Sequence, residues 1–561
     1  MSHSSSNVPS PWWRNSVIYQ LYLRSFADSD GDGIGDLRGI IARLDYLAAL
    51  GVDGIWLNPC YPSPQRDHGY DVSDYMAIEP AYGDLTVFSE LTRELHARGM
   101  KLLMDVVPNH CSEEHSWFRA AVAGGVDHPM RERFYFAEGK GDAPPNDWRS
   151  VFGGPAWTRI TEPDGSPGQW YLHTFTPQQP DFRVDHPLVL EHFREMFCFW
   201  FDRGVDGFRV DAIIFTGKEP GLPDAVPAPE GTPEENVWQF NAHTINHPRM
   251  FPAIASWREV FDAYGREHGK DLVAVSEAYT PRRPENLGAY LGEGRFHQSF
   301  TFDLLLEPWN AANFETAIRD NYETLQALGS LPTWTLNNHD AHRAVTRYGR
   351  RDAASFYSAN NMVNSTRPVD FAVGERRARA AAMLMLALPG AAYMYMGEEL
   401  GLPEVLDMAD ADRQDPLFAR SGGTILGRDG CRIPMPWTPD AETGFGFSGD
   451  GSRTWLPQPR WWGEYAVSRQ DGSAGSVLEL YREALRIRPR FVNEGDEMLV
   501  ARTGDLLMIR RGRFLAAVNF GDDPAYVGTD WVHVASSAPG AWNDEGVLAA
   551  DSAVWLESIP R

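Results

Sequence analysis

The chain of 561 residues has only four cysteines, Cys60, Cys111, Cys198 and Cys431, which are widely spaced and form no CxxC pair. So few cysteines exclude a disulfide-rich scaffold and indicate free thiols, so we expect a cytoplasmic protein. Basic residues are also few: 51 Lys and Arg against 77 Asp and Glu give a formal net charge of −26. A field of this sign repels phosphate, so we expect neither nucleic acid nor an anionic membrane surface as a partner.

The sequence also lacks a long uninterrupted apolar run. The most apolar stretch, Ala380 to Met396, is broken by Pro389-Gly390, which predicts a buried helix followed by a buried strand rather than a membrane span. The opening MSHSSSNVPS has no charged and apolar run of the secretory kind. A globular chain of this length exceeds one compact core, so we expect a large domain with insertions and a smaller second domain.

Three passages share one pattern, in which an amphipathic helical stripe ends at a glycine and an apolar strand follows at once. The glycines are Gly51, Gly99 and Gly204, and the strands are VDGIWLNP, MKLLMDVVPNH and VDGFRVDA. Short strands with apolar residues on both faces, alternating with amphipathic helices, indicate a parallel sheet covered by helices.

Eight such strands are predicted in all, at 17–22, 53–59, 101–107, 205–211, 272–277, 299–304, 332–337 and 391–396. No glycine-rich phosphate turn follows the first strand, which argues against a dinucleotide-binding sheet. Eight strands that each end in polar residues favour a closed barrel over an open doubly wound sheet. The predicted fold class is therefore α/β, a (β/α)₈ TIM barrel.

Two gaps between these strands exceed one helical crossover. Residues 111–180 are rich in Pro, Gly, Trp and Asp and lack helical periodicity, so we expect an inserted subdomain after the third strand. A Pro-rich loop at 213–248 follows the fourth strand and is expected to wall the site. The barrel would then comprise 1–110 and 181–475, and the strands LLMIRR, FLAAVNF and YVGTDWVHV predict an antiparallel β domain over 476–561.

Catalytic residues of TIM barrels lie at the carboxyl ends of the strands. These ends carry a short set of polar side chains: Asp105, Asn109, His110, Arg209, Asp211, Glu277, His339 and Asp340. Taken singly, an Asp after a strand is more often a helix N-cap, and a lone His is more often structural. Asp105 fits that simpler interpretation best, as a buried organiser bonded to backbone or to Arg209. The coincidence of acids, an arginine and histidines on separate strands favours a catalytic site.

Glycoside cleavage requires one ionised carboxylate and one protonated carboxyl group. Arg209 lies two residues before Asp211 on a strand, so both point the same way, and the guanidinium is expected to keep Asp211 ionised. Glu277 follows the apolar run LVAVS, and its burial would raise its pKa as a general acid needs. The spacing along the chain is compatible with either a retaining or an inverting mechanism.

Four motifs at these positions resemble the α-amylase superfamily, glycoside hydrolase family 13, and within it the bacterial α-glucosidase and oligo-1,6-glucosidase group. They are DVVPNH (105–110), GFRVDA (207–212), SEAY (276–279) and NNHD (337–340), in family order. QPDFR (179–183), the opening VIYQLYLRSFADSDGDGIGDL and the later CRIPMPW are also similar to this group. The resemblance covers essentially the whole chain.

The resemblance implies roles for individual positions. Asp211 matches the nucleophile, Glu277 the acid/base, and Asp340 the third carboxylate, which implies retention through a covalent glucosyl-enzyme. Further matches are sugar ligands: Asp67, Tyr70, His110, Arg209, His339 and Arg432. Asp67 and Arg432 closing the blind end of the site would restrict action to terminal glucose of short α-glucosides. No further partner is expected, and the chain is predicted to be a monomer or a small homo-oligomer.

Ala212, the residue after the nucleophile, bears on linkage preference. In this group a Val there resembles α-1,6-cutting enzymes, while a smaller side chain resembles α-1,4-cutting ones, so maltose-like substrates are expected. A methyl-sized difference discriminates by only about 1–3 kcal/mol. A transglucosylase or isomerase acting on sucrose, maltose or trehalose is the main alternative, decided by loops 213–248 and 341–365. A non-catalytic transporter partner subunit is a remote alternative. Such relatives need a membrane anchor and tolerate lost carboxylates, whereas this sequence shows no anchor and keeps all three acids.

The loop after the first strand carries acids at alternate positions around glycines, a spacing typical of hard-cation sites. It imitates half an EF-hand, but its twelfth position is Gly39 rather than Glu, and a solvated acidic turn is the simpler interpretation. The family resemblance favours a structural Ca²⁺ (or Mg²⁺) bound by Asp28, Asp30, Asp32, the Ile34 carbonyl and Asp36.

Overall fold

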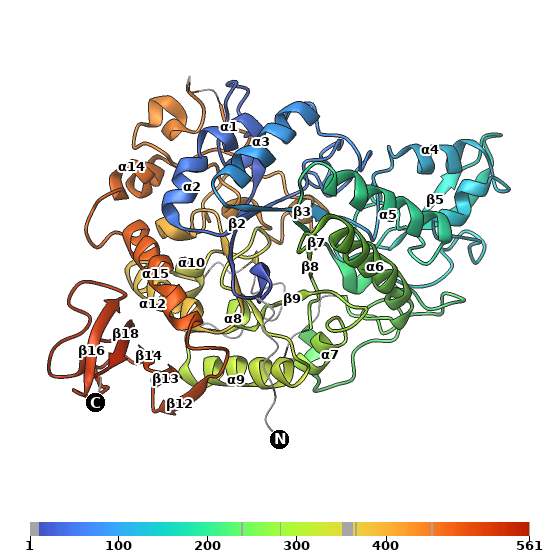
Figure 1. The fold of residues 1–561 in the computed structure, drawn as a ribbon. Coiled ribbons are helices and arrows are strands. Elements are labelled where there is room, and N and C mark those ends of the chain that lie inside the picture. The colour runs from blue at the N-terminus through green and yellow to red at the C-terminus, as the bar shows by residue number, and fades with distance from the viewer. Residues whose placement is uncertain are drawn as a thin grey trace.

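Eight parallel strands form a closed barrel in the computed structural model, which describes residues 10–559 except 237–238, 281, 351–362, 365–366, 450 and 452. The barrel order is β1-β11-β10-β9-β8-β7-β3-β2. The strands are β1 (Val17–Leu21), β2 (Gly54–Leu57), β3 (Lys101–Val106), β7 (Gly207–Val210), β8 (Val273–Ser276), β9 (Gln298–Thr301), β10 (Thr333–Thr335) and β11 (Ala391–Tyr395). Each lies within or beside its predicted range, so the TIM-barrel prediction is confirmed (Figure 1).

Helices surround this barrel, and several begin and end where the sequence signals them. The Asp84 side chain accepts hydrogen bonds from the first backbone N–H groups of α3. Gly51 has a φ of 95° and ends α2 in the left-handed conformation that glycine adopts without strain. The helices are α1 (Leu37–Ala42), α2 (Leu44–Leu50), α3 (Leu85–Ala97), α4 (Ser116–Ala123), α5 (Pro187–Phe201), α6 (Phe251–His268), α7 (Pro284–Gly288), α8 (Asp303–Leu306), α9 (Ala311–Ala327), α10 (Ala344–Tyr348), α12 (Phe371–Ala387), α13 (Pro416–Arg420), α14 (Val467–Gln470) and α15 (Val477–Val492).

The interior of the barrel is packed with apolar side chains from alternate strand positions, as its geometry requires. This inner cluster consists of Ile18, Trp56, Leu103, Val273, Val275, Phe300, Ala391 and Tyr393, all buried. The barrel is therefore a solid support, and polar side chains are left to gather at the carboxyl ends of the strands.

A small three-stranded sheet occupies the predicted insertion, with order β4-β6-β5. Its strands are β4 (Phe136–Ala137), β5 (Trp157–Thr161) and β6 (Pro167–Leu172). A bridge between His110 and Asp181 joins the two ends of this segment. The insertion and the C-terminal sheet lie on opposite sides of the barrel in Figure 1.

The C-terminal segment forms a five-stranded sheet of order β12-β13-β14-β18-β16 beside a two-stranded sheet, β15-β17. The strands are β12 (Leu499–Thr503), β13 (Leu506–Arg511), β14 (Phe514–Asn519), β15 (Ala525–Tyr526), β16 (Trp531–Ser536), β17 (Val547–Leu548) and β18 (Ser552–Ser558). The prediction of one strand through YVGTDWVHV is wrong: Gly528, at a φ of 125°, interrupts it and sends its two parts to different sheets. The domain boundaries at 111–180 and 476–561 stay predictions.

The loop at 213–248 contains only short 3₁₀ turns among its described residues, at Ile213–Phe215, Pro233–Asn236 and Pro248–Met250. Most of the other predicted loop, 341–365, lies outside the described residues beyond α10. Within the described part of the chain, every helix is too short or too polar to cross a bilayer.

Candidate active site

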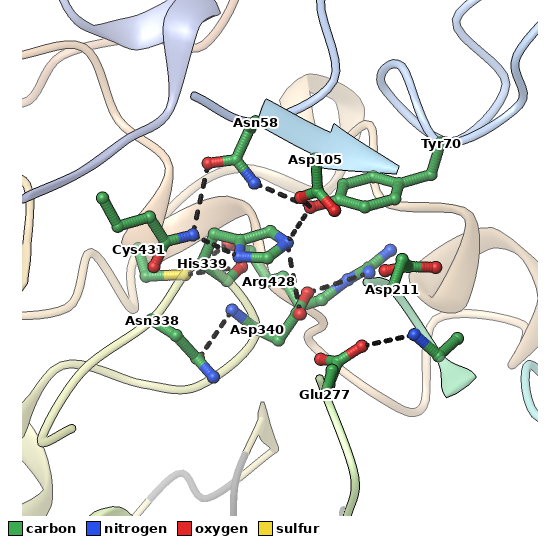
Figure 2. A network of polar contacts seen from close by, with 12 residues as sticks. Asn58, Tyr70, Asp105, Asp211, Glu277, Asn338, His339, Asp340, Arg428 and Cys431 are labelled. Carbon is green, nitrogen blue, oxygen red and sulfur yellow. Dashed lines mark hydrogen bonds and ion pairs between the residues drawn. The ribbon is translucent and has the colours of Figure 1, made fainter. Parts of the chain in front are cut away.

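The three carboxylates predicted to be catalytic lie together at the carboxyl end of the barrel, although their strands are far apart in the sequence (Figure 2). Asp211 directly follows β7, Glu277 directly follows β8, and Asp340 lies on the loop after β10. The Glu277 carboxylate accepts a hydrogen bond of 2.8 Å from the backbone N–H of Ala212. Ala212 itself has a φ of 45°, a conformation uncommon for a non-glycine residue, directly beside Asp211.

Arg209 connects the carboxylates of three strands. Its Nη1 donates to Asp105 Oδ1 at 2.9 Å and to Asp211 Oδ1 at 2.5 Å, and its Nη2 lies 2.6 Å from Glu277 Oε1. Only 1% of Arg209 is exposed. The predicted contacts of Arg209 with Asp211 and with Asp105 are thereby confirmed, whereas its contact with Glu277 was not foreseen.

One guanidinium among three buried carboxyl groups determines their ionisation. Burial raises the pKa values of Asp211, Glu277 and Asp105, and the positive charge of Arg209 offsets part of this increase. The resulting pKa of Asp105 is about 7. The net shift of the Asp211 pKa is upward, so the ion pair with Arg209 offsets only part of the effect of burial. The ionised state of Asp211 stays a prediction. Because one positive charge balances only one carboxylate, the cluster retains a proton at a pH where an isolated carboxylic acid has lost it.

His339 and Asp340 form the next part of the site. The Gln20 amide donates to Nδ1 of His339 at 2.7 Å, which leaves the proton on Nε2. This Nε2 lies 2.7 Å from the Tyr70 hydroxyl and 3.2 Å from Asp340 Oδ2. Burial lowers the pKa of His339 well below its usual range, so the imidazole is neutral. Asp340 stays ionised, because the N–H of the neutral His339 and the positive charges of Arg428 and Arg432 outweigh its burial and lower its pKa.

Asp67 and His110 lie on a third side, next to the inserted segment. Gln179 Nε2 lies 3.2 Å from Asp67 Oδ2 and 3.1 Å from His110 Nε2, so one amide spans both predicted sugar ligands. The His110 ring also approaches the Tyr70 carbonyl oxygen at 3.0 Å. Gln179 is the first residue of QPDFR, and its position within that motif was the only sequence signal for this contact.

Arg428 is the principal residue that the sequence analysis missed, and Asp67 pairs with it. Arg428 Nη2 donates to Asp67 Oδ1 at 2.9 Å, and its Nη1 donates to Asp340 Oδ1 at 3.1 Å. Arg432 is 0% exposed and instead donates to Asp340 Oδ1 and to the His339 carbonyl, both at 2.9 Å. The motif GRDGCR contains two arginines four positions apart, and only the fold distinguishes their partners. The role of Arg432 as a sugar ligand stays a prediction.

The acidic loop after β1 brings three of its predicted metal ligands together. Carboxylate oxygens of Asp28, Asp30 and Asp36 lie within 4.8 Å of one another. Ca²⁺ takes oxygen ligands at about 2.3–2.6 Å, so oxygens bound to one ion lie no more than roughly 5 Å apart, and this arrangement fits. Asp32 Oδ1 instead accepts from the backbone N–H of Ile34 at 2.8 Å. Burial raises the pKa of Asp32, and repulsion from Asp30, Asp28 and Asp36 adds to the shift.

Comparisons with known proteins find relatives along most of the chain. An oligo-1,6-glucosidase of Parageobacillus thermoglucosidasius is 33% identical over 531 residues, which cover 89% of this chain and 86% of that protein. An alpha-glucosidase of Culex pipiens is 34% identical over 485 residues, covering 85% and 75% of the two chains. The solved alpha-glucosyl transfer enzyme XgtA shares 34% identity with a TM-score of 0.83, covering 98% of this chain and 100% of that one.

The trehalulose synthase MutB from Pseudomonas mesoacidophila MX-45 is similar at 28% identity and a TM-score of 0.82, with the same coverage. Residues 20–495 match the family described as alpha amylase, catalytic domain. This match spans the barrel from the end of β1, the inserted sheet and every carboxylate of the site. The chain therefore belongs to the α-amylase family of glycoside hydrolases.

Proposed function

We propose that this chain is a retaining, exo-acting α-glucosidase that releases α-glucose from the non-reducing end of short α-glucosides. The observation that carries the proposal is the Arg209 cluster, which brings Asp211 and Glu277 from adjacent strands against one guanidinium. The similarity to a bacterial oligo-1,6-glucosidase and to an insect alpha-glucosidase supports the same substrate class.

In the proposed mechanism Asp211 attacks the anomeric carbon while Glu277 gives its proton to the departing glycosidic oxygen. The aglycone leaves, and glucose stays bound to Asp211 through an ester. Glu277, now ionised, takes a proton from water, which attacks the anomeric carbon and frees Asp211. Two displacements at one carbon retain its configuration. The mechanism requires that the proton retained by the Arg209 cluster lie on Glu277 when substrate is bound, which leaves Asp211 ionised for attack. Asp340 stays ionised to bind hydroxyl groups of the reacting glucose.

Exo action follows from the charged residues at the Asp67 end of the site. Asp67 and Arg428 are buried, at 4% and 9% exposure, and their ion pair leaves hydrogen-bonding groups for the terminal hydroxyls of one glucose unit. A longer chain continuing past this point would have to separate the pair and bury unpaired charges. Ala212, small and buried beside Asp211, favours α-1,4 over α-1,6 linkages.

The principal alternative is a transglucosylase or isomerase, which uses the same glucosyl-enzyme but passes glucose to a sugar rather than to water. It is supported by the structural similarity to an alpha-glucosyl transfer enzyme and a trehalulose synthase. A partner subunit without activity is a weaker candidate, because this chain keeps all three carboxyl groups in contact with positive charge.

Product analysis with maltose, isomaltose, sucrose and trehalose separates these functions. Free glucose, formed mainly from maltose, is the expected result. New disaccharides or longer glucosides in place of glucose would show that the chain is a transferase or isomerase rather than a hydrolase. A folded protein that is inactive on every sugar would contradict the whole proposal.

The pH dependence of kcat/KM should report the raised pKa of Glu277. Hydrolysis needs Glu277 protonated, so activity is lost as the pH rises through this pKa, which burial places above the usual glutamate value of about 4.3. We expect the alkaline limb to disappear in Glu277→Gln when α-glucosyl fluoride, whose leaving group needs no proton, is the substrate. Rates between about pH 4 and pH 9 test this, and an unchanged alkaline limb in the variant would assign it to another group.

We also propose that the acidic loop binds a structural Ca²⁺ through Asp28, Asp30 and Asp36, with Asp32 and the Ile34 carbonyl as further candidates. The ion would neutralise clustered like charges and hold the loop against Ser448, whose hydroxyl donates to Asp28. Dialysis against a chelator should lower the Tm by a few degrees, and Ca²⁺ should restore it because it binds only the folded chain. Asp30→Asn should abolish the response, whereas Asp74→Asn, which removes one charge elsewhere, should keep it. A Tm that changes with neither chelator nor Ca²⁺ would contradict the metal site and indicate a solvated acidic turn.

The four cysteines, all free in the structure, support a proposed cytoplasmic location.

A further inference from the structure

Arg428 is held from behind by a carboxylate that contacts none of the predicted sugar ligands. Asp415 Oδ2 accepts from Arg428 Nε at 2.8 Å, and Asp415 Oδ1 accepts from Nη2 at 2.9 Å. This two-point contact fixes the plane of the guanidinium as a single bond cannot. The outer edge of the same group then faces Asp67 and Asp340.

Asp415 is itself rigidly positioned. Both its oxygens also accept backbone N–H groups, from Leu417 at the start of α13 and from Arg428. Asp429 Oδ2 accepts the Asp415 backbone N–H at 3.0 Å. Gly427, at a φ of 77°, lets the chain pass close by, because a Cβ there would lie 2.8 Å from Asp415 Oδ2.

The charges explain why such a support is needed. Arg428 faces Asp67 and Asp340, two carboxylates that both attract it, and Phe152 lies over its guanidinium at 5.1 Å. Without a third anchor the side chain could turn toward either carboxylate. Asp415 is 1% exposed, so its charge is little screened by water and its pull on Arg428 is strong.

We infer that Asp415 is a positioning residue that sets the specificity of the site for a terminal glucose by holding Arg428 between Asp67 and Asp340. The inference rests on the proposed function and extends it to a residue outside the predicted site. The hydroxyl that marks a glucose as terminal is the one on carbon 4. Recognition of this hydroxyl should therefore depend on Asp415, although Asp415 does not touch the sugar and acts by holding Arg428.

The test compares glucose with 4-deoxyglucose, both as calorimetric ligands and as p-nitrophenyl α-glycosides. In Asp415→Asn we expect KM and the Kd of glucose to rise about tenfold, as for the loss of a charge-assisted hydrogen bond, with kcat changed much less. The factor by which removal of the 4-hydroxyl raises Kd and KM is called the 4-hydroxyl penalty. It should shrink by a similar amount, because Arg428, which is proposed to bind this hydroxyl, is no longer held in place. A purely structural role would leave that penalty unchanged.

Two further variants complete the test. Asp415→Ser retains a side-chain oxygen to cap α13 but cannot span the guanidinium, so it should match Asp415→Asn in the 4-hydroxyl penalty. Asp407→Asn, an exposed acid in the same loop region, removes the same charge and should behave as wild type. A 4-hydroxyl penalty that is equal in all four proteins would overturn the inference. Wild-type protein that binds glucose but cleaves no glucoside would refute the proposed function, while the binding measurements would still decide the role of Asp415.

Discussion

Asp211→Asn is expected to lower kcat on maltose by about 10⁴-fold or more, with the fold and glucose binding retained. The amide keeps an oxygen that can accept from Arg209, which now contacts Asp211 Oδ1 at 2.5 Å, so the packing of the cluster survives. What is lost is the negative charge that forms the bond to the anomeric carbon. Steady-state kinetics on maltose, with the Kd of glucose and the Tm as accompanying measurements, tests this expectation.

Asp206 provides a matched control at the opposite end of the same strand. It precedes β7, is buried, and pairs with Lys101 at 3.1 Å and with His96 at 2.7 Å. Polar residues at this end of a TIM barrel contribute to stability rather than to catalysis. Asp206→Asn should therefore lower the Tm and leave kcat near the wild-type value. Comparable kcat losses in the two variants, or an Asp211→Asn protein with substantial activity, would remove Asp211 as the nucleophile.

Glu277→Gln is expected to lower kcat/KM on maltose by about 10²–10⁴-fold, because the variant cannot protonate the departing oxygen. The loss should be much smaller for α-glucosyl fluoride, since fluoride leaves without a proton. With this substrate the glucosyl-enzyme should accumulate, because the water that resolves it has no general base. Azide needs no base to attack, and it should speed turnover and yield α-glucosyl azide.

The dependence on the leaving group separates the two carboxylates. Asp211→Asn should be inactive on both maltose and α-glucosyl fluoride, whereas Glu277→Gln should regain much of its activity on α-glucosyl fluoride. The Gln side chain can offer an oxygen to Arg209 or to the Ala212 N–H but not to both, so the Tm must be compared with that of wild type. Equal losses of Glu277→Gln on both substrates, with an intact Tm, would show that Glu277 does not act as the general acid.

The barrel itself was predictable from local signals. Amphipathic helices that end at glycine, as at Gly51, and strands buried on both faces specify helix-covered parallel strands residue by residue. Interruption of the predicted C-terminal strand was not foreseen, because a β-branched and aromatic run fits either one strand or two. The left-handed conformation of Gly528 decided between them.

The candidate site was predictable to the extent that it lies on strand ends. Asp211, Glu277 and Asp340 each occur where an apolar strand gives way to polar residues, and barrel closure forces such ends together. Arg428 and Asp415 lie on a long loop without periodicity, and Arg428 is separated from Asp67 by 361 positions. No local pattern could have paired them, nor have linked Gln20 with His339.

By itself, the sequence determined the barrel, the family and which carboxylates are candidates for catalysis, because each depends on short motifs or on the periodicity of neighbouring residues. Only the tertiary structure decided which arginine pairs with Asp67, and that Arg209 is shared among three carboxyl groups. It also decided that burial raises the pKa of Asp211 despite that arginine. Ion pairing and desolvation depend on which groups from distant segments surround a charge, and that is a property of the packed molecule.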